Sequence, residues 1–334
     1  MILNKASLHI FDFSSDMCVL SKACLNFVQP ANGEFINKHI DKIMKDPDRK
    51  KAKFKEDSAF LETAKAYSES QRNENDLVIL SGSVAQFLFD KLKETDEPSS
   101  CDFLTAEFSE GESIYIAIMI FNHRTAYTHN VLTTSEGPES EVIVHRAILS
   151  TGSKADAYAV VCLDDFSVIY SEKKRIRNGQ AAYVLRDDIL AVEAEASSRE
   201  VVKAVSKAAA EVAEEHGANT AQAVAKARSF IYESSAEGEY FDLEDAAEKV
   251  FGDNSYMQSE FKEKLHESKL PESVSVDRSY AEKQSGKQKI RTDTGIEISF
   301  PADYAESSDY IEFINNPDGT ISIELKKIGK IINK

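Results

Sequence analysis

Hydrophobic and polar positions along the first hundred residues predict a hairpin followed by helices. Apolar and polar residues alternate over residues 7–13 and 17–20, on either side of the turn-forming triplet Ser14-Ser15-Asp16, as expected for two paired strands. Helical periodicity then appears in three stretches, at residues 35–44, 58–70 and 77–93. Pro47 and Pro98, which lie just beyond the first and third of these stretches, are typical signals for the end of a helix.

From residue 101 the pattern changes to strands. β-branched and aromatic residues dominate five segments, at residues 103–108, 113–122, 125–133, 142–149 and 157–170. Turn residues such as Glu110-Gly111 and Glu136-Gly137-Pro138 separate them. Strands joined by such short links favour an antiparallel sheet over alternating β-α-β units. We therefore predict an α+β domain over residues 1–185, with an antiparallel sheet and flanking helices.

The next block is predicted to be helical. Its first helix is expected over residues 187–216, with Gly217 as the residue that ends it. Small side chains recur along this helix at spacings of four and three, at Ala194, Ser198, Val201, Val205, Ala208 and Val212. Such a row suits close helix packing, either inside a helical bundle or between two copies in a dimer. Further helices are predicted at residues 220–233, 243–251 and 255–267.

The C-terminal tail returns to a strand pattern. Apolar residues alternate at 296–300, 310–313 and 321–325, and Asn316-Pro317-Asp318-Gly319 is a strong turn signal between the last two segments. This pattern predicts a small antiparallel β-meander. Together with the helical block it forms the second expected domain, at residues 186–334.

Composition favours a folded protein of the cytoplasm. Hydrophobic residues make up 42% and charged residues 29%, which is enough apolar material for a core. The most apolar stretch, Ile114–Phe121, has the length of a strand, far short of the roughly 20 residues that span a bilayer. The N-terminus has no charged leader followed by a long apolar segment, so we expect a cytoplasmic location with no membrane contact. The four cysteines form no C-x-x-C pair, and reduced thiols are expected.

The net charge of −17 argues against a uniformly DNA-binding surface, because duplex DNA repels an acidic body. Direct DNA contact would therefore need local basic patches. One such cluster covers residues 38–55, with eight basic and three acidic residues, a net of +5. The other two are better candidates for phosphate binding: Lys173, Lys174, Arg175 and Arg177 in one, and Lys283, Lys287, Lys289 and Arg291 in the other. Gln284-Ser285-Gly286 makes the last cluster look like a flexible loop.

Motifs for chemistry are scarce. The chain contains neither G-x-G-x-x-G nor the P-loop pattern, and it lacks H-E-x-x-H and G-x-S-x-G, so we expect no cofactor and no small-molecule substrate. His123, His129 and His145 lie on predicted strands and could converge on a metal in an unrecognised active site. The carboxylate pairs Asp164-Asp165 and Asp187-Asp188 lie near predicted element ends, where capping explains them better than catalysis.

The C-terminal third resembles a known family. Val274-Ser275-Val276-Asp277-Arg278-Ser279 precedes a lysine-rich segment, Gly295–Phe300 forms a short strand, and a closing hairpin runs from Ile311 to Ile323. This order is similar to the ending of the bacterial nucleoid-associated protein family often called NdpA, and Ser113–Ile120 occupies the place of that family's central apolar strand. The resemblance implies residence on the bacterial nucleoid and carries no catalytic residues across.

Within this resemblance only Asp277 and Arg278 can be matched residue by residue, and we expect them to lock the loop structurally rather than to touch DNA. The sequence thus predicts a non-catalytic nucleoid-associated protein that binds DNA directly or through nucleoid proteins. Two alternatives stay open: an enzyme with an unrecognised site, and a structural adaptor that acts as a homodimer.

Overall fold

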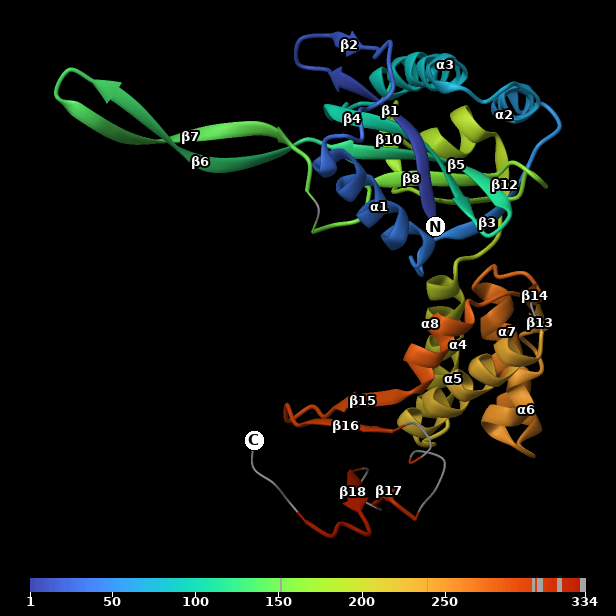
Figure 1. Cartoon of the computed structure of the whole chain (residues 1–334). Helices are drawn as coiled ribbons and strands as arrows, with labels where there is room; N and C mark the ends of the chain where they lie inside the picture. Colours follow the sequence, from blue (N-terminus) through green and yellow to red (C-terminus); the bar gives the residue numbers. More distant parts are fainter. Residues whose placement is uncertain (151, 239, 302–303, 305–308, 317–319, 331–334) are drawn as a thin grey trace. The chain divides into compact units, whose positions relative to one another are not determined.

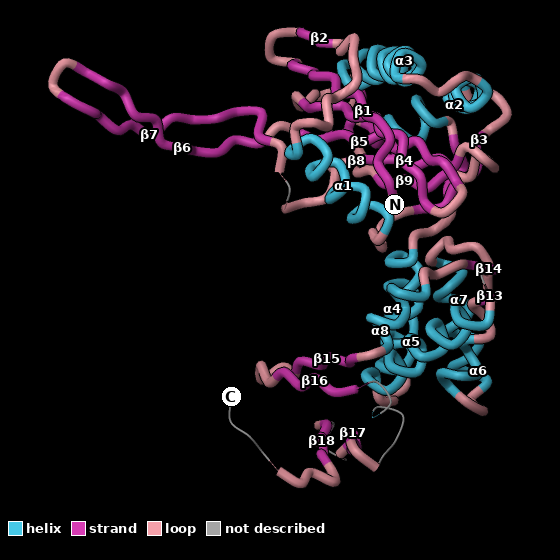
Figure 2. The backbone as a smooth tube through the Cα atoms, in the orientation of Figure 1, coloured by secondary structure: helices cyan, strands magenta, loops and turns pink. Residues whose placement is uncertain are grey.

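The chain divides into two compact units, Met1–Ala194 and Glu195–Lys334. They are seen in a computed structural model, which describes residues 1–150, 152–238, 240–301, 304, 309–316 and 320–330 (Figure 1). Strands are concentrated in the first unit and helices in the second (Figure 2), which confirms the predicted α+β class. The boundary expected after residue 185 falls inside a π-helix, η1 (Val184–Leu190), whose apolar side chains belong to the core of the first unit.

The first unit is built on an eight-stranded antiparallel sheet with the order β12-β3-β9-β8-β5-β4-β1-β2. Its strands are β1 (Ile2–Asp12), β2 (Met17–Val19), β3 (Lys50–Phe54), β4 (Cys101–Glu110), β5 (Ser113–Asn122), β8 (Ala157–Cys162), β9 (Val168–Ser171) and β12 (Val192–Ala194). The predicted N-terminal hairpin and the two strands after residue 101 are confirmed. The single strand expected at 157–170 is two strands, because the chain turns through Phe166 at a positive φ of 56°.

Helices cover both faces of this sheet. On one face α1 (Pro30–Met44) buries Ile36, Ile40 and Ile43 against the central strands. On the other face α2 (Ala59–Glu69), α3 (Glu74–Lys93) and η1 share a larger apolar core with the sheet. Ser58 caps α2, and Asn73 and Asp76 form a capping box at the start of α3, so each helix begins where its polar signal stands.

Two further predicted strands, β6 (Arg124–Thr134) and β7 (Gly137–Ile148), pair with each other and form a sheet of their own. Figure 1 shows this hairpin projecting from the end of β5, away from the eight-stranded sheet. We call it the β6–β7 arm. Its residues were expected to extend the antiparallel sheet; instead β5 pairs directly with β8, which leaves the arm outside.

The long helix predicted over residues 187–216 is wrong in its first part. After η1, Ala191 adopts a left-handed conformation with φ 49°, and β12 then pairs with β3 at the edge of the sheet. The helix α4 (Ser198–Glu215) starts only after Ser197, which forms a capping box with Glu200. Its predicted end is confirmed, since Gly217 follows with a φ of 62°.

In the second unit α4 packs against α5 (Thr220–Glu237) and α7 (Ser255–Glu267), and α6 (Ala246–Phe251) packs against α5 and α7. Val201, Val205 and Val212 of the predicted row are fully buried in this core, and Ala208 is 4% exposed. These four residues therefore form the inner face of a helical bundle, whereas Ala194 of the predicted row is an exposed residue of β12 and Ser198 is the first residue of α4.

The C-terminal part contains one helix that the sequence did not predict. After β13 (Phe241–Asp242) pairs with β14 (Ser273–Val274), α8 (Arg278–Ser285) replaces the expected flexible loop, so Gln284-Ser285-Gly286 is the end of a helix. The expected meander is two hairpins: β15 (Lys287–Arg291) with β16 (Glu297–Pro301), and β17 (Ile311–Asn315) with β18 (Ile321–Leu325). The predicted turn at 316–319 falls largely outside the described residues.

Candidate nucleic-acid interface

The third basic cluster lies on an anchored hairpin. Phe300 of β16 is 8% exposed and joins Ala225 of α5 and Ile311 in a small apolar core, which Ile290 and Ile298 extend. Residues of the opposite parity on β15 face the other way, and Lys289 and Arg291 are exposed there. Arg291 Nη1 lies 4.0 Å from Oε1 of Glu297 on the paired strand. The hairpin therefore has one buried apolar face and one basic face, which we call the β15 basic face.

Lys287 begins the same strand two residues before Lys289, and Lys283 is exposed in the last turn of α8. Helix and strand thus bring the four predicted cations of this cluster into one short segment, with Gly286 as the junction. A Cβ atom at Gly286 would lie 3.0 Å from the Glu282 carbonyl oxygen, so a larger residue would require the chain to shift by a few tenths of an ångström at this junction.

Asp277 caps the helix that carries this segment. Its carboxylate accepts hydrogen bonds from the Tyr280 backbone N–H at 3.1 Å and from the Ser279 hydroxyl at 2.6 Å, while its own N–H donates to the Ser198 hydroxyl. Arg278 is the first residue of α8. A capping role fixes the start of α8 and its attachment to α4.

The second basic cluster contains lysines that are exposed to solvent and an arginine that is held in an ion pair. Lys173 and Lys174 are exposed, and Arg175 is half-buried at the start of β10 (Arg175–Arg177), which pairs with β11 (Gln180–Ala182). Arg177 instead donates two hydrogen bonds to the Asp188 carboxylate, at 3.2 and 2.6 Å. Such a bidentate pair holds the hairpin against η1 and leaves Arg177 little freedom to bind a phosphate.

A pocket of about 180 Å³ adjoins this cluster, with Glu172, Lys173, Lys174 and Arg175 in its wall beside Asp156. The Glu172 carboxylate accepts hydrogen bonds from the backbone N–H groups of Leu185 and Arg186, at 3.1 and 2.6 Å. Burial nevertheless dominates and raises the pKa of Glu172 to about 7. The residue just before Lys173 therefore carries a carboxyl group that is partly protonated near neutral pH.

The first basic cluster is spread over several elements. Lys38 lies one helical turn from Glu34 on α1, and Lys42 donates to the Ser153 carbonyl oxygen. Lys51 and Lys53 are exposed on β3, where Lys53 lies opposite Glu193 of β12. This dispersal makes the cluster a weaker candidate for phosphate binding than the other two.

The three candidate histidines do not meet. His123 contacts the Asp102 carboxylate at 2.9 Å beside the sheet. On the arm, His129 lies opposite Val142 and His145 opposite Ala126, and because side chains alternate along a strand these two rings point to opposite faces. Among the described residues no group of three or more His, Cys, Asp or Glu side chains is placed to hold a metal ion. The three histidines therefore do not form the metal site considered from the sequence.

A buried Ser–His contact, which the sequence did not reveal, cannot work as a nucleophile pair. His9 Nε2 lies 2.6 Å from the Ser81 hydroxyl, and both residues are fully buried. The Ser21 backbone N–H donates to His9 Nδ1, so the neutral ring carries its proton on Nε2 and donates toward Ser81. Ser81 in turn donates to Thr105, and burial lowers the pKa of His9 to about 4. The histidine therefore has no free lone pair with which to activate the serine.

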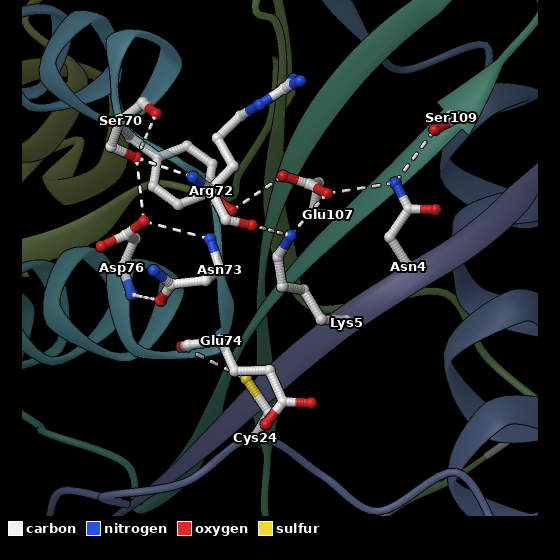
Figure 3. A network of polar contacts seen from close by, with 11 residues as sticks. Asn4, Lys5, Cys24, Ser70, Arg72, Asn73, Glu74, Asp76, Glu107 and Ser109 are labelled. Atoms are coloured by element: carbon white, nitrogen blue, oxygen red, sulfur yellow. Dashed lines mark hydrogen bonds and ion pairs between the residues drawn. The ribbon is translucent and has the colours of Figure 1, made fainter.

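A second buried polar network links β1 and β4 to the α2–α3 connection (Figure 3). Lys5 Nζ lies 2.8 Å from Glu107 Oε1, and their side chains are 14% and 5% exposed. Glu107 also accepts hydrogen bonds from Asn4 and from the Tyr67 hydroxyl, while Lys5 donates to the Arg72 carbonyl oxygen. Burial, followed by the contact with Glu107, raises the pKa of Tyr67. The network is satisfied internally, which fits a structural role.

The two carboxylate pairs have local partners. Asp165 accepts from the Ser167 backbone N–H in the turn between β8 and β9, and Asp187 pairs with Arg186 at 2.7 Å. Asp188 binds Arg177, as described above. Asp164 and Asp165 thus lie in a turn after β8, as the sequence predicted, whereas Asp187 and Asp188 lie inside η1 and not at the end of an element.

The protein is thus a two-unit α+β chain that carries exposed cations on short hairpins. The family model described as nucleoid-associated protein YejK matches residues 5–332 of this chain. Because the match spans nearly the whole chain, the protein belongs to this family of bacterial nucleoid-associated proteins. The resemblance seen in the C-terminal third is thereby confirmed, and the family is not one of known enzymes. A search of curated proteins gave no match. No helix within the described residues is both long and apolar enough to span a membrane.

Proposed function

We propose that this protein binds DNA directly at the bacterial nucleoid, in the cytoplasm, through the β15 basic face. The observation that carries the proposal is the two-sided hairpin: Phe300 anchors one face in an apolar core, and Lys289 and Arg291 project from the other. Anchoring matters because cations held on a fixed surface lose less freedom when they bind phosphates than cations on a mobile loop would.

The geometry of a two-stranded ribbon suits this role. Residues two apart on a strand are roughly 7 Å apart, so Lys289 and Arg291 follow one another at that spacing on the basic face. A two-stranded ribbon is also narrow enough to enter the major groove of B-DNA, which is about 12 Å wide. Phosphate contacts of this kind fix position and supply affinity without reading sequence.

The acidic body limits how the protein can bind. A net charge of −17 repels DNA at long range, so the basic face must act at close range, where the repulsion from distant acidic groups is screened by salt. Lys173, Lys174 and Arg175 supply a second basic segment on the first unit, and we propose them as additional phosphate contacts. Arg177 is assigned to holding its hairpin, because Asp188 already occupies its guanidinium group.

A salt titration tests direct binding. The affinity of the full chain for a labelled duplex is measured by fluorescence anisotropy from low to moderate salt, and direct phosphate contact predicts a steep linear fall of log K with log salt. No binding even at the lowest salt would contradict direct DNA contact and favour recruitment by a basic nucleoid protein.

Two charge-matched variants locate the contact. Reversing Lys283, Lys287 and Lys289 to Glu should weaken binding on all sequences and reduce the salt slope by roughly 2 to 3, because each lost phosphate contact removes about 0.9. The control reverses Lys203, Lys207 and Lys249, which lie on α4 and α6 and change the net charge equally. An equal loss of DNA affinity in both variants would mean that binding depends on the net charge of the whole protein and not on the β15 basic face.

A further inference from the structure

The β6–β7 arm exposes an apolar face to solvent. Tyr127 and Val131 on β6 are 75% and 55% exposed, and Val142 and Val144 on β7 are 74% and 50% exposed. The register places Tyr127 directly opposite Val144, and His129 opposite Val142, so these side chains share one face of the ribbon. Projecting apolar side chains on a single face of a monomer mark an interaction surface.

The arm also lacks the support that a hairpin of this length needs. An isolated two-stranded ribbon is marginally stable in water, and a third strand or an apolar partner is required for independent stability. Among the described residues β6 and β7 have ladder partners only in each other, so each has one edge of unpaired backbone groups. An open, apolar edge is a ready template for another strand.

The charges of the arm point to a protein partner and not to DNA. The arm contains Glu136, Glu139 and Glu141 in its outer part, and its two arginines, Arg124 and Arg146, lie at its base. Arg124 is already paired with Asp156 at 3.0 Å. A ribbon that inserts into DNA needs cations along its length and at its tip, where this arm carries glutamate.

We propose that the arm binds a second copy of this chain, through antiparallel pairing of β7 with β7 of the partner across a twofold axis at Ile143. In that register Val142 lies opposite the partner's Val144, so apolar side chains meet on the exposed apolar face. Glu141 lies opposite the partner's His145 on the other face, and the symmetry repeats each contact twice. The sequence of β7 is thus complementary to itself, because valine meets valine on one face and a carboxylate meets an imidazole on the other.

The resulting four-stranded sheet would give the arm the additional strands that its stability requires. Pairing along one strand buries less than the roughly 1,200 Å² of a stable specific interface, so the dimer should dissociate in the micromolar range. This inference is independent of DNA binding, because nothing in the contact involves either basic hairpin.

Sedimentation equilibrium of the full chain without DNA, from about 1 to 200 µM, tests the proposal in the concentration range expected of a weak interface. The average mass should rise from monomer toward dimer. Glu141→Lys and His145→Glu should each weaken association roughly tenfold, because each places like charges or an unmatched pair opposite one another twice. The double variant restores a Lys–Glu pair and should recover affinity to within about threefold of the natural chain. A monomer mass throughout, or a double variant as weak as the singles, would overturn the pairing.

Cross-linking fixes the register. Ile143→Cys places a thiol opposite its own copy across the axis, within reach of a disulfide, whereas Val131→Cys on β6 lies away from the paired edge. Mild oxidation should give a covalent dimer from the first variant only. Both variants lie outside the sheet core, so unchanged thermal unfolding serves as the folding control. Equal cross-linking of both, or of neither, would contradict this register.

Discussion

Two hairpins of this protein share an architecture and differ in everything that surrounds it. The β15–β16 hairpin buries Phe300 and exposes Lys289 and Arg291, whereas the β6–β7 arm exposes Tyr127 and Val142 and carries glutamates toward its tip. The first has its apolar contacts within the chain and presents charge to solvent. The second presents apolar surface and has no packing partner among the described residues of its own chain. The side chains that a hairpin leaves exposed, cationic in one case and apolar in the other, therefore indicate the kind of partner that it binds.

A third hairpin, β10–β11, is intermediate in how it is held in place. It is held by the ion pair of Arg177 with Asp188 and follows directly after Glu172, so electrostatic contacts take the place of an apolar anchor. The three ribbons therefore differ in the physical source of their stability. Substitutions that remove each source should therefore destabilise the protein by different amounts.

The largest effect on stability is expected at the apolar anchor. Phe300→Ala removes a nearly buried aromatic ring and should destabilise the β15–β16 hairpin by about 3 kcal/mol. Hydrogen exchange of the β15 amides should become faster by about two orders of magnitude, while the amides of β4 and β5 keep their protection. Unchanged exchange in β15 would show that the hairpin does not depend on this core.

A slightly smaller effect is expected from the pH dependence of Glu172. Its pKa is raised to about 7 in the folded chain, against 4.5 when exposed. Between these values the unfolded state loses a proton that the folded state keeps, so this group's contribution to stability falls as the pH rises from about 4.5 to about 7 and is constant above. Between pH 5 and pH 8 the fall is about 2.5 kcal/mol.

Glu172→Gln should remove that fall, and chemical denaturation of both proteins at pH 5 and pH 8 checks it. The comparison with the variant is essential, because the lowered pKa of His9 makes its own contribution rise with pH over an overlapping range. Identical pH profiles for the two proteins would contradict a buried, protonated Glu172.

A moderate effect is expected at the ion pair. Arg177→Ala leaves the half-buried Asp188 carboxylate without its two hydrogen bonds and should cost about 1 to 2 kcal/mol. Lys174→Ala, an exposed neighbour in the same segment, should change stability by less than about 0.5 kcal/mol. Urea unfolding of both variants measures the difference, and an equal response would mean that Arg177 is as free as Lys174.

The smallest effect on the isolated chain is expected in the arm. Val142 is 74% exposed, so Val142→Ala should change the free energy of unfolding by less than about 0.5 kcal/mol when measured by thermal unfolding at low protein concentration. A loss of 2 kcal/mol or more would mean that the arm packs within its own chain, and the contrast with Phe300 would disappear.

Local patterns explain most of what the sequence could predict. Strands such as Ser113–Asn122 and caps such as Asn219 and Gly217 are determined by residues next to one another, and these were found. The helix expected over 187–216 failed because small residues continue the helical period through Val192–Ala194, while pairing with distant β3 turns that segment into a strand. No local signal reports such a pairing.

The candidate site was predictable to the same degree. The basic residues of β15 could be read from the sequence, but Asp277 as the cap of α8 could not, because that short helix has only a weak pattern. The networks around Lys5–Glu107 and His9–Ser81 join residues about seventy to a hundred positions apart, and only the fold reveals them.

The central claim, that DNA contacts the β15–β16 hairpin and not the arm, can be tested by site-specific photo-cross-linking. A photoreactive amino acid replaces Ser299, which lies opposite Lys289 on the basic face, or Val131, which is exposed on the arm. With a labelled duplex at low salt, we predict a protein–DNA adduct from position 299 and none from position 131. An adduct from position 131 alone, or from neither position while the duplex remains bound, would contradict the account.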